Sequence, residues 1–175
     1  MRCAVLAKYL KDLGAEVLFF CRQMPGDLSR YLGDCNLPVY TLPTRGDESS
    51  WDLRRYETWL GVELGKEIFE SKSALKEFGP FDWLVVDHYS LDCKWHSIMS
   101  DVTRRIFVID DLALRRHECD ILLNHAYLPD LEHRYKSLVN NETTLLLGPD
   151  YFILDPVFEN IRHKALHRDG KIRRV

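Results

Sequence analysis

Trp83-Leu84-Val85-Val86-Asp87-His88-Tyr89 decides the fold, because in it an uninterrupted apolar run ends abruptly on polar residues. The same pattern recurs at Ile106-Phe107-Val108-Ile109-Asp110-Asp111 and at Ile121-Leu122-Leu123-Asn124-His125. Short runs of large and β-branched residues without polar alternation are typical of strands buried on both faces of a parallel sheet. Ligands bind such sheets beyond the carboxyl ends of the strands. The three runs therefore predict one rim that carries carboxylates, an amide, imidazoles and a phenol.

Helix and strand patterns alternate along the rest of the chain. Gly14 and Gly79-Pro80 are expected to end helices, Asp27 to cap one, and Gly61 to break one. The alternation predicts an α/β fold, a Rossmann-like doubly wound parallel sheet. The expected helices are residues 3–13, 27–35, 53–78, 92–102, 129–138 and 155–166, and the expected strands are 17–21, 39–42, 83–86, 105–109, 121–124 and 143–147.

Both ends of the sequence suggest a piece of a longer protein. A doubly wound domain normally begins with a strand, yet Met1-Arg2 already stands in the first turn of a helix, so we expect the first strand to be missing. Asp169-Gly170 is typical of a turn, and 171–175 reads as the beginning of a strand. We therefore expect a domain over 1–168, with 169–175 the start of a missing C-terminal domain. Neighbours of an absent strand would have unpaired edges, which predicts self-association.

Composition excludes several classes of protein. The 175 residues are 46% hydrophobic and 29% charged, which fits one well-buried globular domain. The net charge is -3 and the two signs are interspersed, so neither a nucleic acid nor a membrane surface is an expected partner. Because no apolar stretch approaches the roughly 18 residues of a membrane helix and no signal peptide is recognisable, we expect a cytoplasmic protein.

Cysteine spacing favours neither disulfides nor a metal site. The five cysteines are an odd number and include no CxxC pair. His117, Cys119 and Asp120 provide one short spacing, whereas zinc sites usually show two. We expect no metal and no cofactor.

The residues after the first run of the opening pattern are the candidate catalytic group. Asp87 could act as a base, orient a histidine or accept a hydrogen bond from a sugar hydroxyl, or it could simply cap the turn. Tyr89 suits a sugar or pyrophosphate oxygen, or an amphipathic edge of the core, and His88 could point into the opposite layer. Because a solvent-facing rim has no packing need for all three, their adjacency favours function.

Three further residues are candidates for substrate binding, and each of them also has a structural interpretation. Asp110, beside Asp111, could help a metal hold a nucleotide diphosphate, but the cations at 115–116 favour an ion-pair interpretation. Asn124 could bind a ligand or end its strand in a turn, and Arg22 could bind a phosphate or be solvated. Trp59-Leu60-Gly61-Val62 lies in a helical pattern, which favours core and turn over a stacking platform. The chain contains no P-loop, GxGxxG or nucleophile elbow.

An ordered series of short motifs spans nearly the whole chain and resembles the pseudaminic acid biosynthesis hydrolase family known as PseG. Each motif alone is weak, but their order and compact spacing are specific. The motifs are Met1-Arg2-Cys3, Phe20-Cys21-Arg22, Pro25-Gly26-Asp27-Leu28, Trp59-Leu60-Gly61-Val62, Val86-Asp87-His88-Tyr89-Ser90-Leu91-Asp92, Val108-Ile109-Asp110-Asp111-Leu112-Ala113, Cys119-Asp120-Ile121-Leu122-Leu123-Asn124 and Leu147-Gly148-Pro149-Asp150-Tyr151.

The resemblance implies a GT-B fold, in which two Rossmann-like domains enclose a UDP-sugar. It also implies hydrolysis of UDP-2,4-diacetamido-2,4,6-trideoxy-β-L-altropyranose, in a pathway that serves flagellin glycosylation. No metal takes part: a histidine assists the water, and donors from the second domain stabilise the departing UDP. Glycosyltransferases of GT-B type and spore-coat polysaccharide proteins are similar alternatives, and a non-catalytic nucleotide-sugar-binding or protein-binding module is a third.

Carried over residue by residue, Tyr89 matches the active-site tyrosine of the family's Asp-His-Tyr motif, with Asp87 and His88 as companions. Arg2 matches the arginine after the glycine-rich loop, at a helix N-terminus where anions are favoured. The family's catalytic histidine lies immediately before the segment that matches Met1. We therefore expect little or no hydrolase activity from this polypeptide alone.

Overall fold

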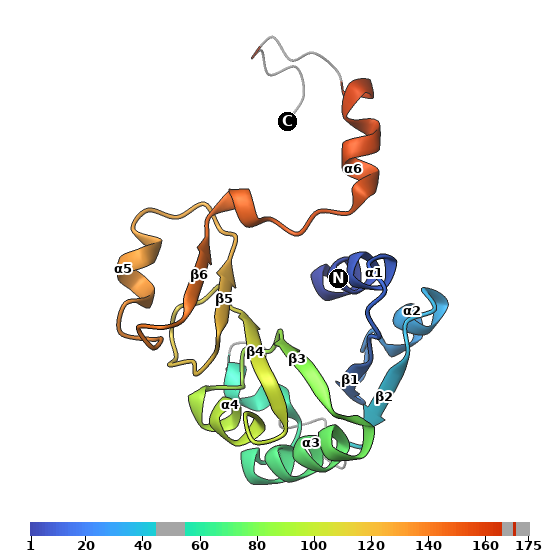
Figure 1. Cartoon of the computed structure of the whole chain (residues 1–175), viewed down its shortest axis with the longest axis vertical. Helices are drawn as coiled ribbons and strands as arrows, with labels where there is room; N and C mark the ends of the chain where they lie inside the picture. Colours follow the sequence, from blue (N-terminus) through green and yellow to red (C-terminus); the bar gives the residue numbers. More distant parts are fainter. Residues whose placement is uncertain (45–54, 166–169, 171–175) are drawn as a thin grey trace.

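The computed structural model describes residues 1–44, 55–165 and 170, and within these ranges the strands form two parallel sheets (Figure 1). Strands β1 (Phe19–Arg22) and β2 (Val39–Leu42) pair with each other. A four-stranded sheet has the order β3-β4-β5-β6 and all its strands are parallel. The predicted α/β class with a parallel sheet is confirmed, and the arrangement is consistent with a Rossmann-like fold. The four strands are β3 (Phe81–Val86), β4 (Thr103–Ile109), β5 (Ile121–Asn124) and β6 (Thr144–Leu147).

The register of the larger sheet brings the ends of its strands to one edge. Val86, the last residue of β3, lies opposite Val108, and Val108 lies opposite Leu122. Asn124, the last residue of β5, lies opposite Leu147 at the end of β6. The residues that follow β3, β4 and β5 therefore emerge close together.

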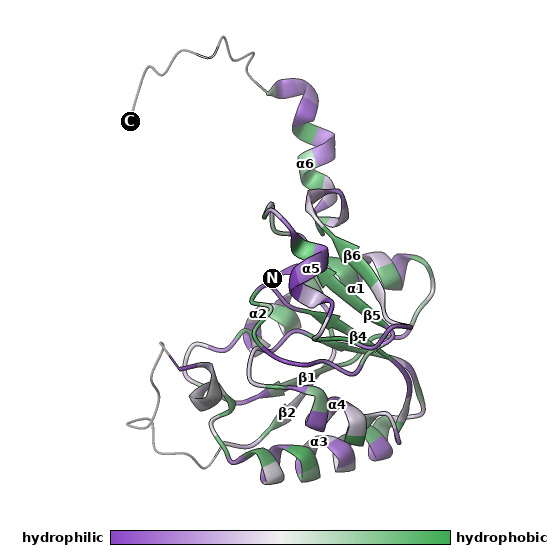
Figure 2. Cartoon of the chain, turned by 90° about the vertical axis from the view of Figure 1, so that its left-hand side faces the viewer, coloured by the Kyte–Doolittle hydropathy of each residue, from purple (hydrophilic) through white to green (hydrophobic). Residues whose placement is uncertain are grey.

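Helices α3 (Leu64–Phe78) and α4 (Cys93–Met99) contact each other and cover one face of this sheet (Figure 1). Figure 2 shows hydrophobic and hydrophilic residues alternating along α3, as expected of a helix with one buried face. The main core lies between these helices and the strands. Its buried residues include Leu75, Trp95, Met99, Val86, Ile106, Val108 and Leu122.

A second, smaller core joins α1 (Arg2–Asp12) and α2 (Ser29–Asp34) to β1 and β2. Ala4 and Ala7 are both 3% exposed, and such small side chains let α1 pack closely. Within the described ranges, β1 and β3 share no backbone ladder, and side chains join the two sheets instead. The Phe20 ring lies 5.8 Å from the Phe81 ring on β3.

Several sequence predictions can be compared with the observed bounds. The strands at 39–42 and 121–124 are confirmed as predicted, and Gly14 follows α1 with a φ of 89°. The predicted helix over 53–78 is indeed broken at Gly61: a 3-10 helix, η2 (Tyr56–Leu60), precedes it and α3 follows. Gly61 has a φ of 67°, and a Cβ there would lie 2.9 Å from the Met24 sulfur. A larger residue would be strained at this position.

Other predicted elements are shorter in the structure or lie outside the described residues. The helix predicted over 92–102 ends at Met99, and β4 begins at Thr103. The helix predicted over 129–138 is reduced to α5 (Leu131–Tyr135). The Asp27 side chain accepts the Ser29 N–H just before α2, close to its predicted role as a cap. Residues 53–54, 166–169 and the strand predicted over 171–175 are not among those described.

The chain leaves the sheet after β6. A 3-10 turn, η3 (Pro149–Tyr151), leads to α6 (Pro156–Ile161), which η4 (Arg162–Lys164) extends. Helix α6 stands away from the sheet in both views (Figures 1 and 2). None of the helices in the described ranges is long and apolar enough to cross a bilayer.

Candidate functional site

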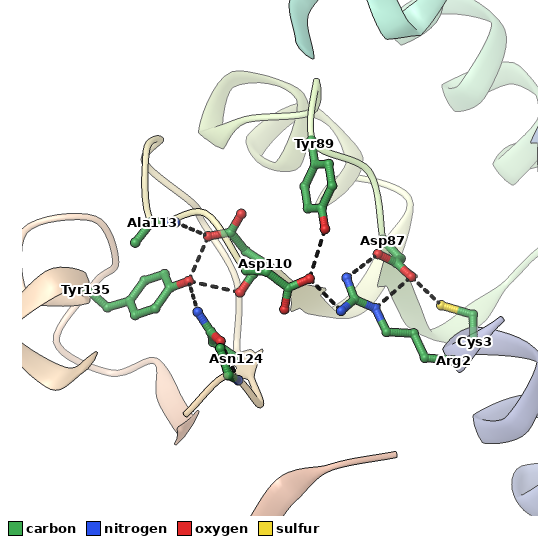
Figure 3. Close-up of polar contacts among 10 residues, drawn as sticks. Arg2, Cys3, Asp87, Tyr89, Asp110, Ala113, Asn124 and Tyr135 are labelled. Atoms are coloured by element: carbon green, nitrogen blue, oxygen red, sulfur yellow. Dashed lines mark hydrogen bonds and ion pairs between the residues drawn. The ribbon is translucent and has the colours of Figure 1, made fainter. Parts of the chain in front are cut away.

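Arg2 joins the carboxyl ends of two strands. It opens α1, and its guanidinium binds Asp87 after β3 through two contacts, Nη2 to Oδ1 at 2.7 Å and Nε to Oδ2 at 3.0 Å. Its Nη1 donates to Asp111 Oδ2, after β4, at 2.6 Å (Figure 3). The side chain of Arg2 is 17% exposed, so solvent partly reaches these ion pairs. The strand-end cluster is defined as Arg2, Cys3, Asp87, Tyr89 and Asp111.

Two protonated groups complete the strand-end cluster. The Tyr89 hydroxyl donates to Asp111 Oδ2 at 2.8 Å, and the Cys3 thiol donates to Asp87 Oδ2 at 3.3 Å (Figure 3). Burial and the hydrogen bond to Asp111 raise the pKa of Tyr89 to about 12. Burial and the nearby Asp87 charge raise the pKa of Cys3 to about 12. At neutral pH both groups are therefore hydrogen-bond donors rather than bases or nucleophiles.

The charge of the strand-end cluster favours neutral polar ligands over phosphate. Burial by itself would lower the pKa of Arg2, but hydrogen bonds and charges from Asp87 and Asp111 outweigh it, so the pKa is raised and the cation persists. One cation thus faces two carboxylates. Carboxylate oxygens accept hydrogen bonds from hydroxyl and amide groups, whereas they repel an approaching diphosphate.

A second group of polar residues is buried beneath the strand-end cluster. The Tyr135 hydroxyl donates to Asp110 Oδ2 at 2.8 Å and accepts from Asn124 Nδ2 at 2.9 Å. The same Asp110 oxygen accepts the Ala113 N–H at 2.8 Å, and Asn124 Oδ1 accepts the Ala126 N–H (Figure 3). Asp110 is 5% exposed, and Asn124 and Tyr135 are fully buried. We refer to Asp110, Asn124 and Tyr135 as the strand-end network, which ties α5 to the ends of β4 and β5.

Two histidines lie beside this network. Burial would raise the pKa of Asp110, but contacts with His117, the Ala113 N–H and Tyr135 outweigh it and lower the pKa. His117 Nε2 is 3.7 Å from Asp110 Oδ2, too long for a hydrogen bond. The ring of His96 stacks on His117 at 5.5 Å, and its nitrogens have no hydrogen-bond partner within the described ranges. Burial, with a smaller effect of His117, lowers the pKa of His96 to about 3.

Five of the seven predicted site residues lie in two groups at the rim, and the other two have partners elsewhere. Arg2, Asp87 and Tyr89 meet in the strand-end cluster. Asp110 and Asn124 meet in the strand-end network, joined to the cluster through the peptide bond between Asp110 and Asp111. The two groups share one rim of the sheet, as Figure 3 shows.

His88 and Arg22 have other partners. His88 Nδ1 accepts the Ser90 N–H at 3.1 Å, which ties the ring to its own turn, and burial lowers its pKa. Arg22 Nη2 lies 2.6 Å from Glu67 and Nη1 lies 2.7 Å from Glu70, both on α3. The charge of Arg22 is thus neutralised in the ion pairs that join β1 to α3.

Sequence reasoning did not identify Asp111, Tyr56 or Trp59 as site residues at this rim. Asp111 rather than Asp110 belongs to the strand-end cluster, and side-chain alternation along β4 could have shown this. Val108 and Asp110 share the helix-covered face, so Asp111 has to point elsewhere. Tyr56 and Trp59 on η2 are the other two: the Tyr89 ring lies 5.8 Å from Tyr56 and 5.9 Å from Trp59. Trp59, interpreted from its helical pattern as core and turn, therefore borders the rim.

The arrangement offers acceptors, one protonated phenol and aromatic faces in one place. Among the described residues, His, Cys, Asp and Glu side chains do not gather in threes as a metal site would require. Neither the models of known protein families nor the curated proteins include a match to this chain.

Proposed function

We propose that this chain binds a UDP-sugar at the strand-end cluster, as the sugar-side Rossmann-like domain of a GT-B-type hydrolase. The proposed reaction is release of UDP from UDP-2,4-diacetamido-2,4,6-trideoxy-β-L-altropyranose, the activity that the ordered motifs of the sequence suggest. One observation carries the proposal: Arg2, Asp87, Tyr89 and Asp111 come from three separate segments and meet beyond the strand ends. That is where ligands bind in open α/β sheets.

The chemistry of the strand-end cluster supports a sugar rather than a diphosphate as the group bound there. Asp87 and Asp111 supply acceptors for hydroxyl or amide hydrogens, and the rings of Tyr89 and Trp59 supply apolar surface. Sites for small molecules typically combine apolar and aromatic walls with a few placed polar groups. The diphosphate would lie further from these carboxylates.

Each residue of the cluster has a defined role in this proposal. Asp87 and Asp111 orient the sugar, and Arg2 fixes the spacing of the two carboxylates because it binds both. Tyr89, with its pKa raised to about 12, stays protonated and does not abstract a proton from water; since its O–H is donated to Asp111, its oxygen accepts a hydrogen bond from a substrate hydroxyl. In the reaction a water oxygen bonds to the anomeric carbon while the bond from that carbon to UDP breaks. The water proton needs a base other than Tyr89.

The test separates binding from turnover. We expect the UDP-sugar to bind the chain in a calorimetric or NMR titration, and Tyr89→Phe and Asp111→Asn to weaken binding by about 10-fold each, since each removes a hydrogen bond to a partly desolvated ligand. Asp82→Asn is the matched control, because Asp82 is an exposed residue of β3 that pairs only with the exposed Arg104 in the described contacts. Its affinity should stay unchanged.

Three results would count against the proposal. They are the absence of binding to the folded chain, equal affinities for the Tyr89→Phe and Asp82→Asn variants, and a site mapped away from the strand ends. UDP release should be slower than about 1 per second, the lower end of typical enzyme turnover. Product analysis identifies the reaction type, since hydrolysis yields free sugar and transfer yields a glycoside.

A further inference from the structure

Helix α6 and the segment that leads to it expose a concentration of large apolar side chains. Both views show α6 standing away from the two sheets (Figures 1 and 2). Concentrations of exposed apolar residues on a protein surface usually mark a site of interaction. Six of the eleven residues from 151 to 161 have large apolar side chains that are 45% to 56% exposed, namely Tyr151, Phe152, Leu154, Val157, Phe158 and Ile161.

The apolar side chains of α6 share one face of the helix. Val157, Phe158 and Ile161 are spaced so that they lie within about 100° around the helix axis. Figure 2 shows hydrophobic and hydrophilic segments alternating along α6, as this spacing requires. So short a helix is stable only when its apolar face is packed against another surface. The face of α6 therefore needs a partner.

The charges of this segment are divided between its two ends. Glu159 lies in α6 after the N-cap Asp155, whereas Arg162 and Lys164 follow in η4. Glu159, Arg162 and Lys164 are all exposed. Two copies of the segment that pack antiparallel would bring the acidic half of each against the basic half of the other. A parallel pair would bring like charges together.

We propose that two copies of this chain associate through α6, with the two helices antiparallel and their apolar faces in contact. A two-fold axis relates the copies, so each contact occurs twice. Glu159 and Arg162 are three residues apart and therefore share one flank of the apolar face. In the register that places Phe158 of one copy against Ile161 of the other, Glu159 of each copy lies close to Arg162 of the other copy. The face is thus complementary to itself.

The size of the apolar surface sets the expected strength of this dimer. Six large side chains that are each about half exposed supply roughly 500 Å² per copy, or about 1,000 Å² in the pair. That area is at the lower end of specific protein interfaces, where association is weak and reversible. We expect a dissociation constant on the order of 10 to 100 μM.

The first experiment measures association and locates it. Sedimentation of the full chain from about 5 to 500 μM should show a reversible equilibrium between monomer and dimer. Phe158→Glu places a carboxylate in the apolar contact and should weaken the dimer by at least about 10-fold. Phe69→Glu is the matched control, because Phe69 is 73% exposed on a different helix, α3, and its dissociation constant should stay unchanged. Circular dichroism shows whether each variant is folded.

The second experiment tests the antiparallel direction through charge. Glu159→Arg and Arg162→Glu each replace two attractions across the dimer by two repulsions, so each should weaken association by about 10-fold. The double variant Glu159→Arg/Arg162→Glu restores opposite charges in an antiparallel dimer and should associate like the unmodified chain. In a parallel dimer neither single variant would change the pattern of like charges.

The contrary outcomes are specific. A monomer over the whole concentration range would overturn the proposal. A dimer that persists in Phe158→Glu would also overturn it, since the contact would then lie elsewhere, for instance at the outer edge of β6. Single charge variants that associate normally, or a double variant as weak as the single ones, would overturn the antiparallel pairing.

Discussion

Asp110 and Asp111 are adjacent and chemically identical, yet the structure gives them opposite environments. The side chain of Asp110 is 8% exposed and belongs to the strand-end network, whereas the side chain of Asp111 is 24% exposed and belongs to the strand-end cluster. The difference follows from the alternation of side chains at the end of β4. One carboxylate holds α5 to the sheet, and its neighbour is placed where a ligand can reach it. Position along a strand, rather than residue type, therefore separates a structural residue from a candidate binding residue.

The same substitution at both positions tests this contrast most strongly. Asp110→Asn should lower the free energy of unfolding by about 3 kcal/mol, because the hydrogen bonds from the Ala113 N–H and the Tyr135 hydroxyl to Oδ2 lose the buried charge that strengthens them. Asp111→Asn should lower it by less than about 1 kcal/mol, since a partly exposed ion pair contributes little to stability. Urea-induced unfolding, followed by circular dichroism, measures both.

Tyr135→Phe serves as a control for the network. It removes only the hydroxyl that joins Asp110 to Asn124, and should cost about 1 to 2 kcal/mol, less than Asp110→Asn. If Asp110→Asn and Asp111→Asn destabilised the protein equally, the contrast between network and cluster would be wrong.

The buried His96 should make the stability of the folded protein depend on pH. His96 has a folded-state pKa of about 3 against an ordinary value of 6.5, so between these pH values the unfolded chain binds a proton that the folded chain does not. Stability should therefore be complete above pH 6.5 and fall as the pH decreases toward 3. From His96 alone the loss at pH 5 is about 2 kcal/mol, at roughly 1.4 kcal/mol for each pH unit.

His96→Leu should flatten this part of the pH dependence, when thermal unfolding is measured from pH 7.5 to 4.5. His133, which is exposed on α5, provides the control: His133→Leu should leave the slope unchanged. The lowered pKa of Asp110 adds a loss at still lower pH, as that carboxylate becomes protonated. An unaltered slope in His96→Leu would show that another group carries the acid sensitivity.

The smallest effect on stability is expected in the strand-end cluster itself. Arg2→Met should reduce the free energy of unfolding by about 1 kcal/mol or less, because its two ion pairs are partly open to solvent. UDP-sugar binding should weaken, since Asp87 and Asp111 would then repel each other without the shared cation. Arg104→Met removes an ion pair of the same kind whose side chains are 80% and 78% exposed, and both stability and binding should stay as they are. Equal loss of binding in both variants would contradict the role assigned to Arg2.

The sequence predicted the strands and their common edge well, because apolar runs and the polar residues behind them are local signals. It did not predict which residues pair there. Arg2 is 85 residues from Asp87 and 109 from Asp111, and no local pattern records such contacts. Arg22 illustrates the same limit, since its position after β1 suggested a phosphate ligand, while its partners Glu67 and Glu70 are set by the packing of α3.

The segment around Trp59 shows a second limit of sequence reasoning. Apolar spacing predicted one helical region from 53 to 78, with a break near Gly61. The break is confirmed, but spacing could not show that the short 3-10 turn before it would place Tyr56 and Trp59 against Tyr89. The orientation of such a short turn is determined by its contacts with distant parts of the chain.

The joint between the two sheets has a consequence for the dynamics of the protein. Within the described ranges, no continuous ladder joins β1 to β3: an aromatic contact connects β1 to β3, and an ion pair connects β1 to α3. Segments joined in this way can open as a unit at a lower free energy than the core requires. The amide hydrogens of β1 and β2 should accordingly exchange with solvent as one cooperative block, ahead of those in β4 and β5.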